Sequence, residues 1–175
     1  MLLGKKKRDL KSRLIPLSLS AGIILLDQIA KLIVIRLVPY GHPVSVIGDF
    51  FRIVRVQNTA IAFSIGRNLP MGTQRTLFGL LPLVVIAIIF LYYLFTRDEI
   101  TGFQKWCFAA LIGGGLGNYV DRIFRPAGVV DFLDFKFYGI LGLERWPTFN
   151  IADMTVVVAG ILLFISFLVP SGAKK

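Results

Sequence analysis

Four long apolar segments set the limits on what this chain can fold into. They run over residues 14–38, 76–95, 106–120 and 149–169, and the second has no charged residue. A helix needs about 20 mainly apolar residues to cross a bilayer, and the third segment reaches this length only if it begins at residue 103. The chain is 55% hydrophobic and 17% charged over 175 residues, which is more apolar surface than a soluble domain of this size can bury. We therefore expect a membrane protein with spans at about residues 14–38, 76–95, 103–120 and 149–169.

Positive charge is concentrated at the N-terminus. Six of the 20 Lys and Arg residues lie within the first 13 residues, and the net charge is +10. Such a cluster beside an apolar segment is typical of the cytoplasmic end of a membrane helix and does not predict nucleic-acid binding. Four spans then predict that both termini are cytoplasmic, with outer loops at about residues 39–75 and 121–148. These loops carry eight Lys and Arg residues, for which we expect a binding or structural role.

Strand-like patterns occur in the first outer loop. Val44–Ile47 and Phe51–Val56 are short alternating or apolar runs separated by a Gly-Asp turn, which predicts a small sheet. Residues 129–146 have mixed strand and turn character. The expected fold class is an all-α membrane protein with a small β element: four transmembrane helices plus an outer-face β-sheet.

The first apolar segment contains two ionisable residues. Ionisable side chains inside a membrane span are costly, so each is a candidate functional residue. Asp27 and Lys31 lie four residues apart on one helix face, with the acid in the favourable N-terminal position. They form either a neutralised pair that holds this helix to its neighbours or one polar wall of a site.

The third apolar segment ends in glycines followed by polar residues. Gly113 and Gly117 form a small-xxx-small pattern that lets a neighbouring helix approach closely. Asn118, Asp121 and Arg122 follow at spacings that put them on one face of a continued helix. The planar guanidinium of Arg122 can bind a carboxylate or peptide carbonyls. A structural arrangement of Asp121 and Arg122 explains the pair equally well.

Further aspartates lie in and before the fourth apolar segment. Asp131 follows a Gly-Val-Val run, so we do not expect a solvated surface charge there. Asp134 lies among outer-loop residues, and we expect it to be solvated. Asn150 is a good N-cap for the fourth helix, with Asp153 at its third helical position. Helix capping is therefore one interpretation of Asp153.

The available side chains favour aspartic-protease chemistry. His42, the only histidine, lies in a Gly-His-Pro turn, and Cys107, the only cysteine, lies in an apolar stretch where we predict a packing role. In an aspartic protease two carboxylates share one proton: the ionised one takes a proton from water, and the protonated one polarises the scissile carbonyl.

Other interpretations remain open at this point. A proton-coupled carrier also explains Asp27, Lys31 and Asp153, although no internal repeat is visible. A non-catalytic membrane adaptor leaves Asp131 and Asp153 without a purpose. The residues alone leave Asp27, Asp121 and Asp131 as competing partners of Asp153.

Five sequence blocks follow one another from the first apolar segment to the fourth. They are Asp27-Gln-Ile-Ala-Lys31, Gln57-Asn58-Thr-Ala-Ile-Ala-Phe-Ser64, Gly113-Gly-Gly-Leu-Gly-Asn118-Tyr-Val-Asp121-Arg122, Gly128-Val-Val-Asp131-Phe132 and Phe149-Asn150-Ile-Ala-Asp153. In this order and at this spacing, the chain resembles the bacterial lipoprotein signal peptidases, also called type II signal peptidases. One block alone is weak, but all five together are highly specific.

The resemblance implies a single membrane-embedded peptidase domain over residues 1–175, an intramembrane aspartic protease. Such enzymes cut prolipoproteins just before a cysteine that carries diacylglyceryl, and thereby release the signal peptide. The family's catalytic pair corresponds to Asp131 and Asp153. Family positions that line the site and bind substrate correspond to Asp27, Lys31, Asn58, Asn118, Arg122 and Asn150, and a supporting position corresponds to Asp121.

The resemblance also has implications for the ligands and the location of the enzyme. It implies no cofactor and no metal, and inhibition by the cyclic peptide globomycin. The expected location is the bacterial cytoplasmic (inner) membrane, with the site near the outer face, where the substrate arrives through the lipid.

The chain departs from the family pattern in three places. Ala60 and Ile61 stand where the family usually has glycine and alanine, and glycine tolerates backbone angles that alanine does not. The stretch before Asp131 is slightly longer and contains Pro126, and residues 136–147 are slightly expanded. These departures concern the rim of the expected site.

Overall fold

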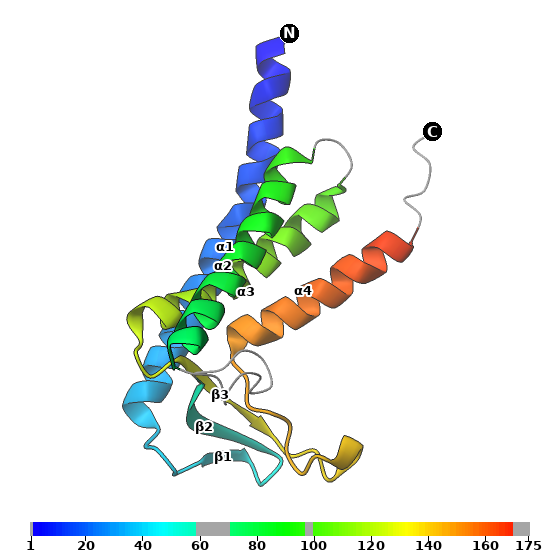
Figure 1. The fold of residues 1–175 in the computed structure, drawn as a ribbon. Helices are drawn as coiled ribbons and strands as arrows, with labels where there is room; N and C mark the ends of the chain where they lie inside the picture. The colour runs from blue at the N-terminus through cyan, green and yellow to red at the C-terminus, as the bar shows by residue number, and fades with distance from the viewer. Residues whose placement is uncertain (1, 59–70, 97–99, 170–175) are drawn as a thin grey trace.

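The computed structural model describes residues 2–58, 71–96 and 100–169 (Figure 1). Within these ranges the helices are α1 (Leu2–Leu37), α2 (Met71–Phe95), α3 (Gly102–Phe124) and α4 (Ile151–Leu168), with a short 3-10 helix η2 (Ile140–Gly142). The strands are β1 (Val44–Ile47), β2 (Phe51–Asn58) and β3 (Val129–Phe135). The predicted combination of a mainly helical chain with a small sheet is confirmed. The departures at Ala60 and Ile61 lie outside the described residues.

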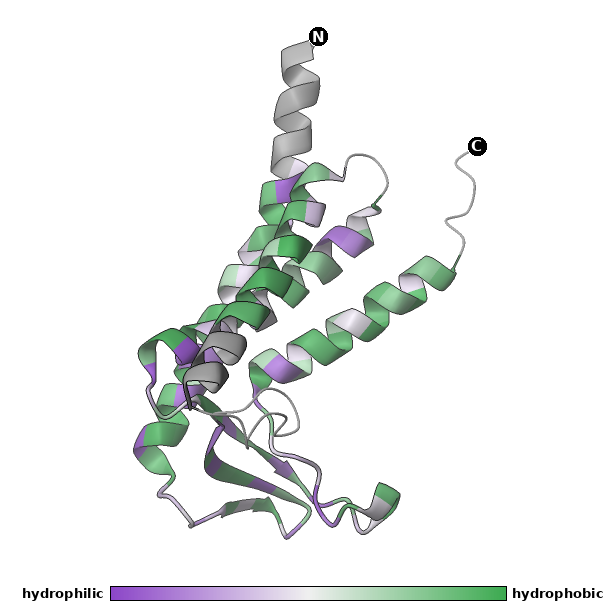
Figure 2. Cartoon of the chain, in the orientation of Figure 1, coloured by the Kyte–Doolittle hydropathy of each residue, from purple (hydrophilic) through white to green (hydrophobic). Residues whose placement is uncertain are grey.

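Two helices are long and apolar enough to cross a membrane, in the part of the chain that the structure describes. They are Ser12–Leu37 within α1 and Ile151–Leu168, which is α4. In the most apolar stretch of each helix, only 28% and 11% of the residues, respectively, are buried inside the protein. Many of their large hydrophobic side chains are exposed, as in lipid-facing helices. Figure 2 shows that both helices are mainly hydrophobic. The apolar part of α2, Gly79–Phe95, is shorter, and α3 does not meet the same test. Two of the four predicted spans therefore coincide with helices that are long and apolar enough to cross a membrane, and the spans at α2 and α3 stay predictions.

Glycines let α3 pack closely against α1 and α4. A Cβ atom on Gly113 would lie 2.8 Å from Cα of Ser20 in α1, and one on Gly114 would lie 2.7 Å from the carbonyl oxygen of Ala152 in α4. A Cβ on Gly117 would lie 3.2 Å from Cβ of Ala152. The close helix approach predicted from the glycine spacing is confirmed.

The end of the bundle away from the sheet has an apolar core. Cys107 is buried there with Tyr93 and Phe108, which confirms its predicted packing role. Arg13 of α1 binds the C-terminal end of α2, with its guanidinium donating to the carbonyls of Tyr93 at 2.8 Å and Leu94 at 2.6 Å. A cation at this end of a helix satisfies carbonyls that have no partner in the helix itself.

The three strands form an antiparallel sheet in the order β1-β2-β3 at one end of the helix bundle (Figure 1). The Leu2 end of α1 and the Leu168 end of α4 lie at the opposite end. In the register of β2 with β3, Val56 pairs with Asp131. The sheet therefore places Asp131 at the end of the helix bundle where the strands lie.

Asp134 is only 3% exposed, so the expectation that it is solvated is wrong. Arg52, its register partner on β2, lies 2.8 Å from its Oδ2 atom, and Arg145 lies 2.7 Å from its Oδ1 atom. Two guanidinium groups thus compensate the buried carboxylate. These contacts give two of the basic residues in the predicted outer loops a structural role.

Candidate active site

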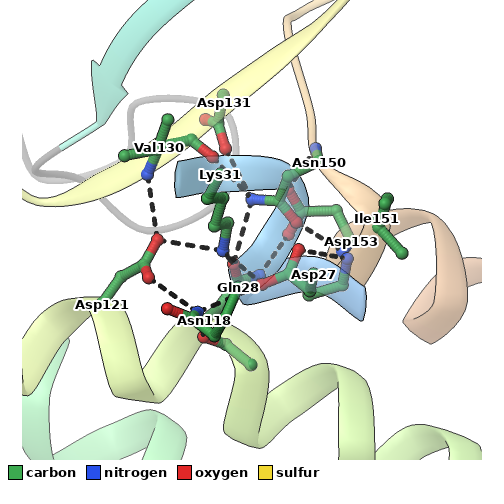
Figure 3. Close-up of polar contacts among 12 residues, drawn as sticks. Asp27, Gln28, Lys31, Asn118, Asp121, Val130, Asp131, Asn150, Ile151 and Asp153 are labelled. Atoms are coloured by element: carbon green, nitrogen blue, oxygen red, sulfur yellow. Dashed lines mark hydrogen bonds and ion pairs between the residues drawn. The ribbon is translucent and has the colours of Figure 1, made fainter. Parts of the chain in front are cut away.

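Polar side chains from five separate elements meet where the helix bundle joins the sheet, and Figure 3 shows those from α1, α3, β3 and the start of α4. They come from α1, β2, α3, β3 and the start of α4, and are Asp27, Gln28 and Lys31; Asn58; Asn118 and Asp121; Asp131; and Asn150 and Asp153. All site residues predicted from the sequence except Arg122 are joined in this hydrogen-bonded network.

Asp131 is 3% exposed and is held by amide groups. Its Oδ1 atom accepts a hydrogen bond from Nδ2 of Asn150 at 2.7 Å, and its Oδ2 atom accepts one from Nδ2 of Asn58 at 3.1 Å. Burial raises the pKa of Asp131 to about 6, and the negative charge of Asp153 contributes to the rise. The two amide hydrogen bonds and the charge of Lys31 oppose this shift of the pKa.

Asp153 and Asn150 form the predicted cap at the start of α4. The N–H of Asp153 donates to Oδ1 of Asn150 at 2.9 Å, and the N–H of Asn150 donates to Oδ2 of Asp153 at 3.2 Å. The second oxygen of Asp153 accepts a hydrogen bond from Asn118 at 2.7 Å. Because the amide nitrogen of Asn150 also donates to Asp131, this side chain bridges the two aspartates.

Asp27 and Lys31 form an ion pair of 2.7 Å inside the protein, with both side chains fully buried. The ammonium group also lies 2.9 Å from Oδ2 of Asp121 in α3. Of the two interpretations of this pair, attachment of the first helix to a neighbour is therefore confirmed. Its contacts extend to the polar network around Asp131 and Asp153.

Gln28 and Arg125 belong to the network but were not predicted as site residues. Nε2 of Gln28 donates to the carbonyl of Gly117 and to Oδ1 of Asp121, both at 2.9 Å. Arg125 donates to the same carboxylate oxygen and, at 3.0 Å, to Oε1 of Gln28. The spacing of four residues between Asp121 and Arg125 was a usable signal, because such residues share a helix face.

Arg122 is partly exposed and is the predicted site residue outside the network. It makes no side-chain hydrogen bond or ion pair with the residues described in the structure, although its charge acts on Asp131 and Asp153. Within the same ranges, no group of three or more His, Cys, Asp and Glu side chains is arranged to hold a metal.

The sequence is similar to a known protein family and to several of its members. The family described as Signal peptidase (SPase) II matches residues 19–169, which include every candidate site residue. A lipoprotein signal peptidase of Treponema pallidum (strain Nichols) is 46% identical over 94% of this chain and 88% of its own length. Those of Borreliella afzelii (strain PKo) and Treponema denticola are 44% and 40% identical, over 83% and 94% of this chain and 84% and 94% of their own lengths.

The fold is similar to two solved structures of a bacterial membrane enzyme. The first has a TM-score of 0.74 at 24% identity and covers 92% of both chains, and the second has a TM-score of 0.73 at 24% identity over 90% of this chain and 94% of the other. Together, the apolar helices and the family match define a membrane-embedded protease. The chain belongs to the signal peptidase II family.

Proposed function

We propose that the chain is an aspartic endopeptidase that removes the signal peptide from diacylglyceryl-modified prolipoproteins by cutting just before the lipidated cysteine. Its catalytic residues are Asp131 and Asp153. One observation carries the proposal: Asp27 and Asp121 are neutralised by Lys31 and Arg125, whereas Asp131 and Asp153 form no ion pair within the described ranges. The names of the relatives support the substrate class.

The two carboxylates have complementary tasks in this reaction. The ionised one takes a proton from water, whose oxygen attacks the carbonyl carbon before the cysteine, while the protonated one donates a hydrogen bond to the carbonyl oxygen. When the carbon–nitrogen bond breaks, a proton passes to the nitrogen of the cysteine. The signal peptide leaves with a new carboxylate. Asn118 and Asn150 hold the carboxylates in place by their amide hydrogen bonds.

Substrate recognition involves the remaining polar residues and the lipid. Arg122 has donors available for peptide carbonyls near the two aspartates, and Asn58 lies beside Asp131 at the end of β2. The outward apolar faces of α1 and α4 allow a lipid-anchored substrate to approach through the bilayer. The proposed location is the bacterial cytoplasmic membrane, with cytoplasmic termini and the site near the outer face. A globomycin-type cyclic peptide would compete for this site.

The proposal is tested by identifying the products. The purified chain in detergent is incubated with a synthetic prolipoprotein peptide, with or without diacylglyceryl on its cysteine, and the products are identified by mass spectrometry. We expect one cut, before the lipidated cysteine, and no cut in the unlipidated peptide. A cut elsewhere, equal cutting of both peptides, or no cutting of either would contradict the proposal.

The pH dependence of cleavage follows from the pKa of Asp131, which is raised to about 6 by burial and by the charge of Asp153. The pair is active with one shared proton, so activity is lost at low pH, where both groups are protonated, and at high pH, where both are ionised. We expect a bell-shaped profile of kcat/KM whose alkaline limb has an apparent pKa of about 6. A profile without an alkaline limb would contradict the shared proton.

A further inference from the structure

We propose that Lys31 is a positioning residue for Asp131 and Asp153, and that it does not contact the substrate. The resemblance gave Lys31 only the general role of lining the site and binding substrate. The inference rests on the proposed catalytic pair, and deepens it by assigning the buried ammonium group a task of its own.

All three N–H bonds of the Lys31 ammonium have acceptors inside the protein. An ammonium group has three donors and no acceptor. Nζ of Lys31 lies 2.7 Å from Oδ2 of Asp27, 2.9 Å from Oδ2 of Asp121 and 2.9 Å from Oδ1 of Asn118. The Lys31 side chain has no exposed surface. No donor is therefore left for a peptide carbonyl or a lipid headgroup.

The two carboxylates bound by Lys31 each hold a backbone N–H group beside the catalytic pair. Asp27 accepts a hydrogen bond from the N–H of Ala152 at 3.0 Å, and Asp121 accepts one from the N–H of Val130 at 3.1 Å. Each N–H belongs to the residue directly before one of the two catalytic aspartates. Lys31 thus ties α1 and α3 to the backbone that carries both carboxylates (Figure 3).

The third contact of Lys31 orients the amide groups between the catalytic aspartates. Oδ1 of Asn118 accepts from Lys31 and, at 2.9 Å, from Nδ2 of Asn150. With its oxygen held by two donors, Asn118 presents its nitrogen to Asp153 at 2.7 Å. The amide nitrogen of Asn150, held by the same oxygen, donates to Asp131 at 2.7 Å. One ammonium group therefore sets the direction of both amide hydrogen bonds.

The charges around Lys31 determine which variant can test this role. Lys31 and Arg125 balance Asp27 and Asp121, so loss of Lys31 alone would leave a buried carboxylate uncompensated and threaten folding. The double substitution Asp27→Asn with Lys31→Met keeps this balance. The new amide oxygen at position 27 can still accept from Ala152, while the contacts of Lys31 with Asp121 and Asn118 are lost.

The test separates binding from turnover in the double variant. Titration with a non-cleavable lipidated peptide counts the folded sites and gives Kd, and single-turnover cleavage gives the rate per bound site. We expect unchanged Kd and a rate per bound site about 100-fold lower, because a misplacement of about 1 Å in catalytic groups costs about that much. Lys105→Met, at the other end of α3, is the control and should leave both values unchanged.

Each other outcome decides against the inference. A weaker Kd with an unchanged rate per site would make Lys31 a substrate contact. Fewer sites with normal Kd and rate would make its role purely structural. Asp131→Asn is measured in parallel: if that variant still cleaves, the catalytic pair itself is wrong. If Asp131→Asn is inactive but the double variant cleaves normally per site, only the role of Lys31 is wrong.

Discussion

Replacing Asp131 or Asp153 by Asn is expected to lower the rate of cleavage by about 1,000-fold or more, because an amide can neither take a proton from water nor give one to the scissile carbonyl. The fold should survive the change at Asp131. The pKa of this group rises from 3.8 to about 6 in the folded chain, so its stabilising contribution is present at low pH and is lost as the pH rises through about 6. At pH 7 the neutral amide removes the cost of burying an ionised carboxylate, but its NH2 group faces a side-chain N–H donor where Asp131 accepted a second hydrogen bond. These two effects oppose each other, so we expect a melting temperature close to that of the unchanged chain.

Asp134, three residues further along β3, provides the matched control. It is as buried as Asp131, but its oxygens bind Arg52 and Arg145 on the sheet. Asp134→Asn should therefore lower the melting temperature and leave the rate per folded molecule unchanged. Equal loss of rate in both strand variants would mean that the strand, and not the carboxylate of Asp131, is what cleavage requires.

The second large effect is expected from one added methyl group between α3 and α4. In Gly114→Ala the new Cβ would lie 2.7 Å from the carbonyl oxygen of Ala152 and 2.8 Å from a methyl group of Val156. A backbone oxygen cannot turn away, so α4 must shift, at a cost of about 1–3 kcal/mol in stability. Ala152 directly precedes Asp153, so the shift displaces that carboxylate. We expect cleavage to fall by about 100-fold.

Gly160→Ala is the matched control for this packing prediction. Gly160 is also helical, but a Cβ there would have no atom within 4 Å. Alanine is favoured over glycine in a helix by about 1 kcal/mol, so this variant should be slightly more stable and fully active. Melting curves and cleavage rates in the same detergent compare the two. Identical behaviour of the two variants would show that α3 and α4 are not in close contact at Gly114.

Local spacing was enough to predict several features of this fold. The cap formed by Asn150 and Asp153 involves residues three apart, and the pair of Asp27 and Lys31 involves residues four apart in one helix. The small-residue pattern containing Gly113 predicted close helix packing in the same way. Such features depend on one element at a time, so they can be predicted without knowing the tertiary structure.

Contacts between distant segments were the ones that sequence reasoning missed. Asp134 was expected in solvent because it lies among outer-loop residues. Its partner Arg52 lies on another strand and is brought to it only by the sheet register, which local spacing does not reveal. The choice of the second catalytic aspartate shows the same limitation. Spacing left Asp27, Asp121 and Asp131 as competing partners of Asp153, and the three-dimensional contacts show that Lys31 and Arg125 neutralise Asp27 and Asp121.

The cleavage rate of Asp153→Asn at saturating lipidated substrate tests the central proposal most directly, because Asp153 has a competing explanation as a helix cap. Its Oδ2 atom accepts from the N–H of Asn150 at 3.2 Å, and an Asn side-chain oxygen can accept the same hydrogen bond. The substitution therefore keeps the cap and removes the carboxylate. If circular dichroism shows that the helix content is unchanged, we predict that the rate falls by about 1,000-fold or more. A rate close to that of the unchanged chain would make Asp153 a cap alone and contradict the proposed catalytic pair.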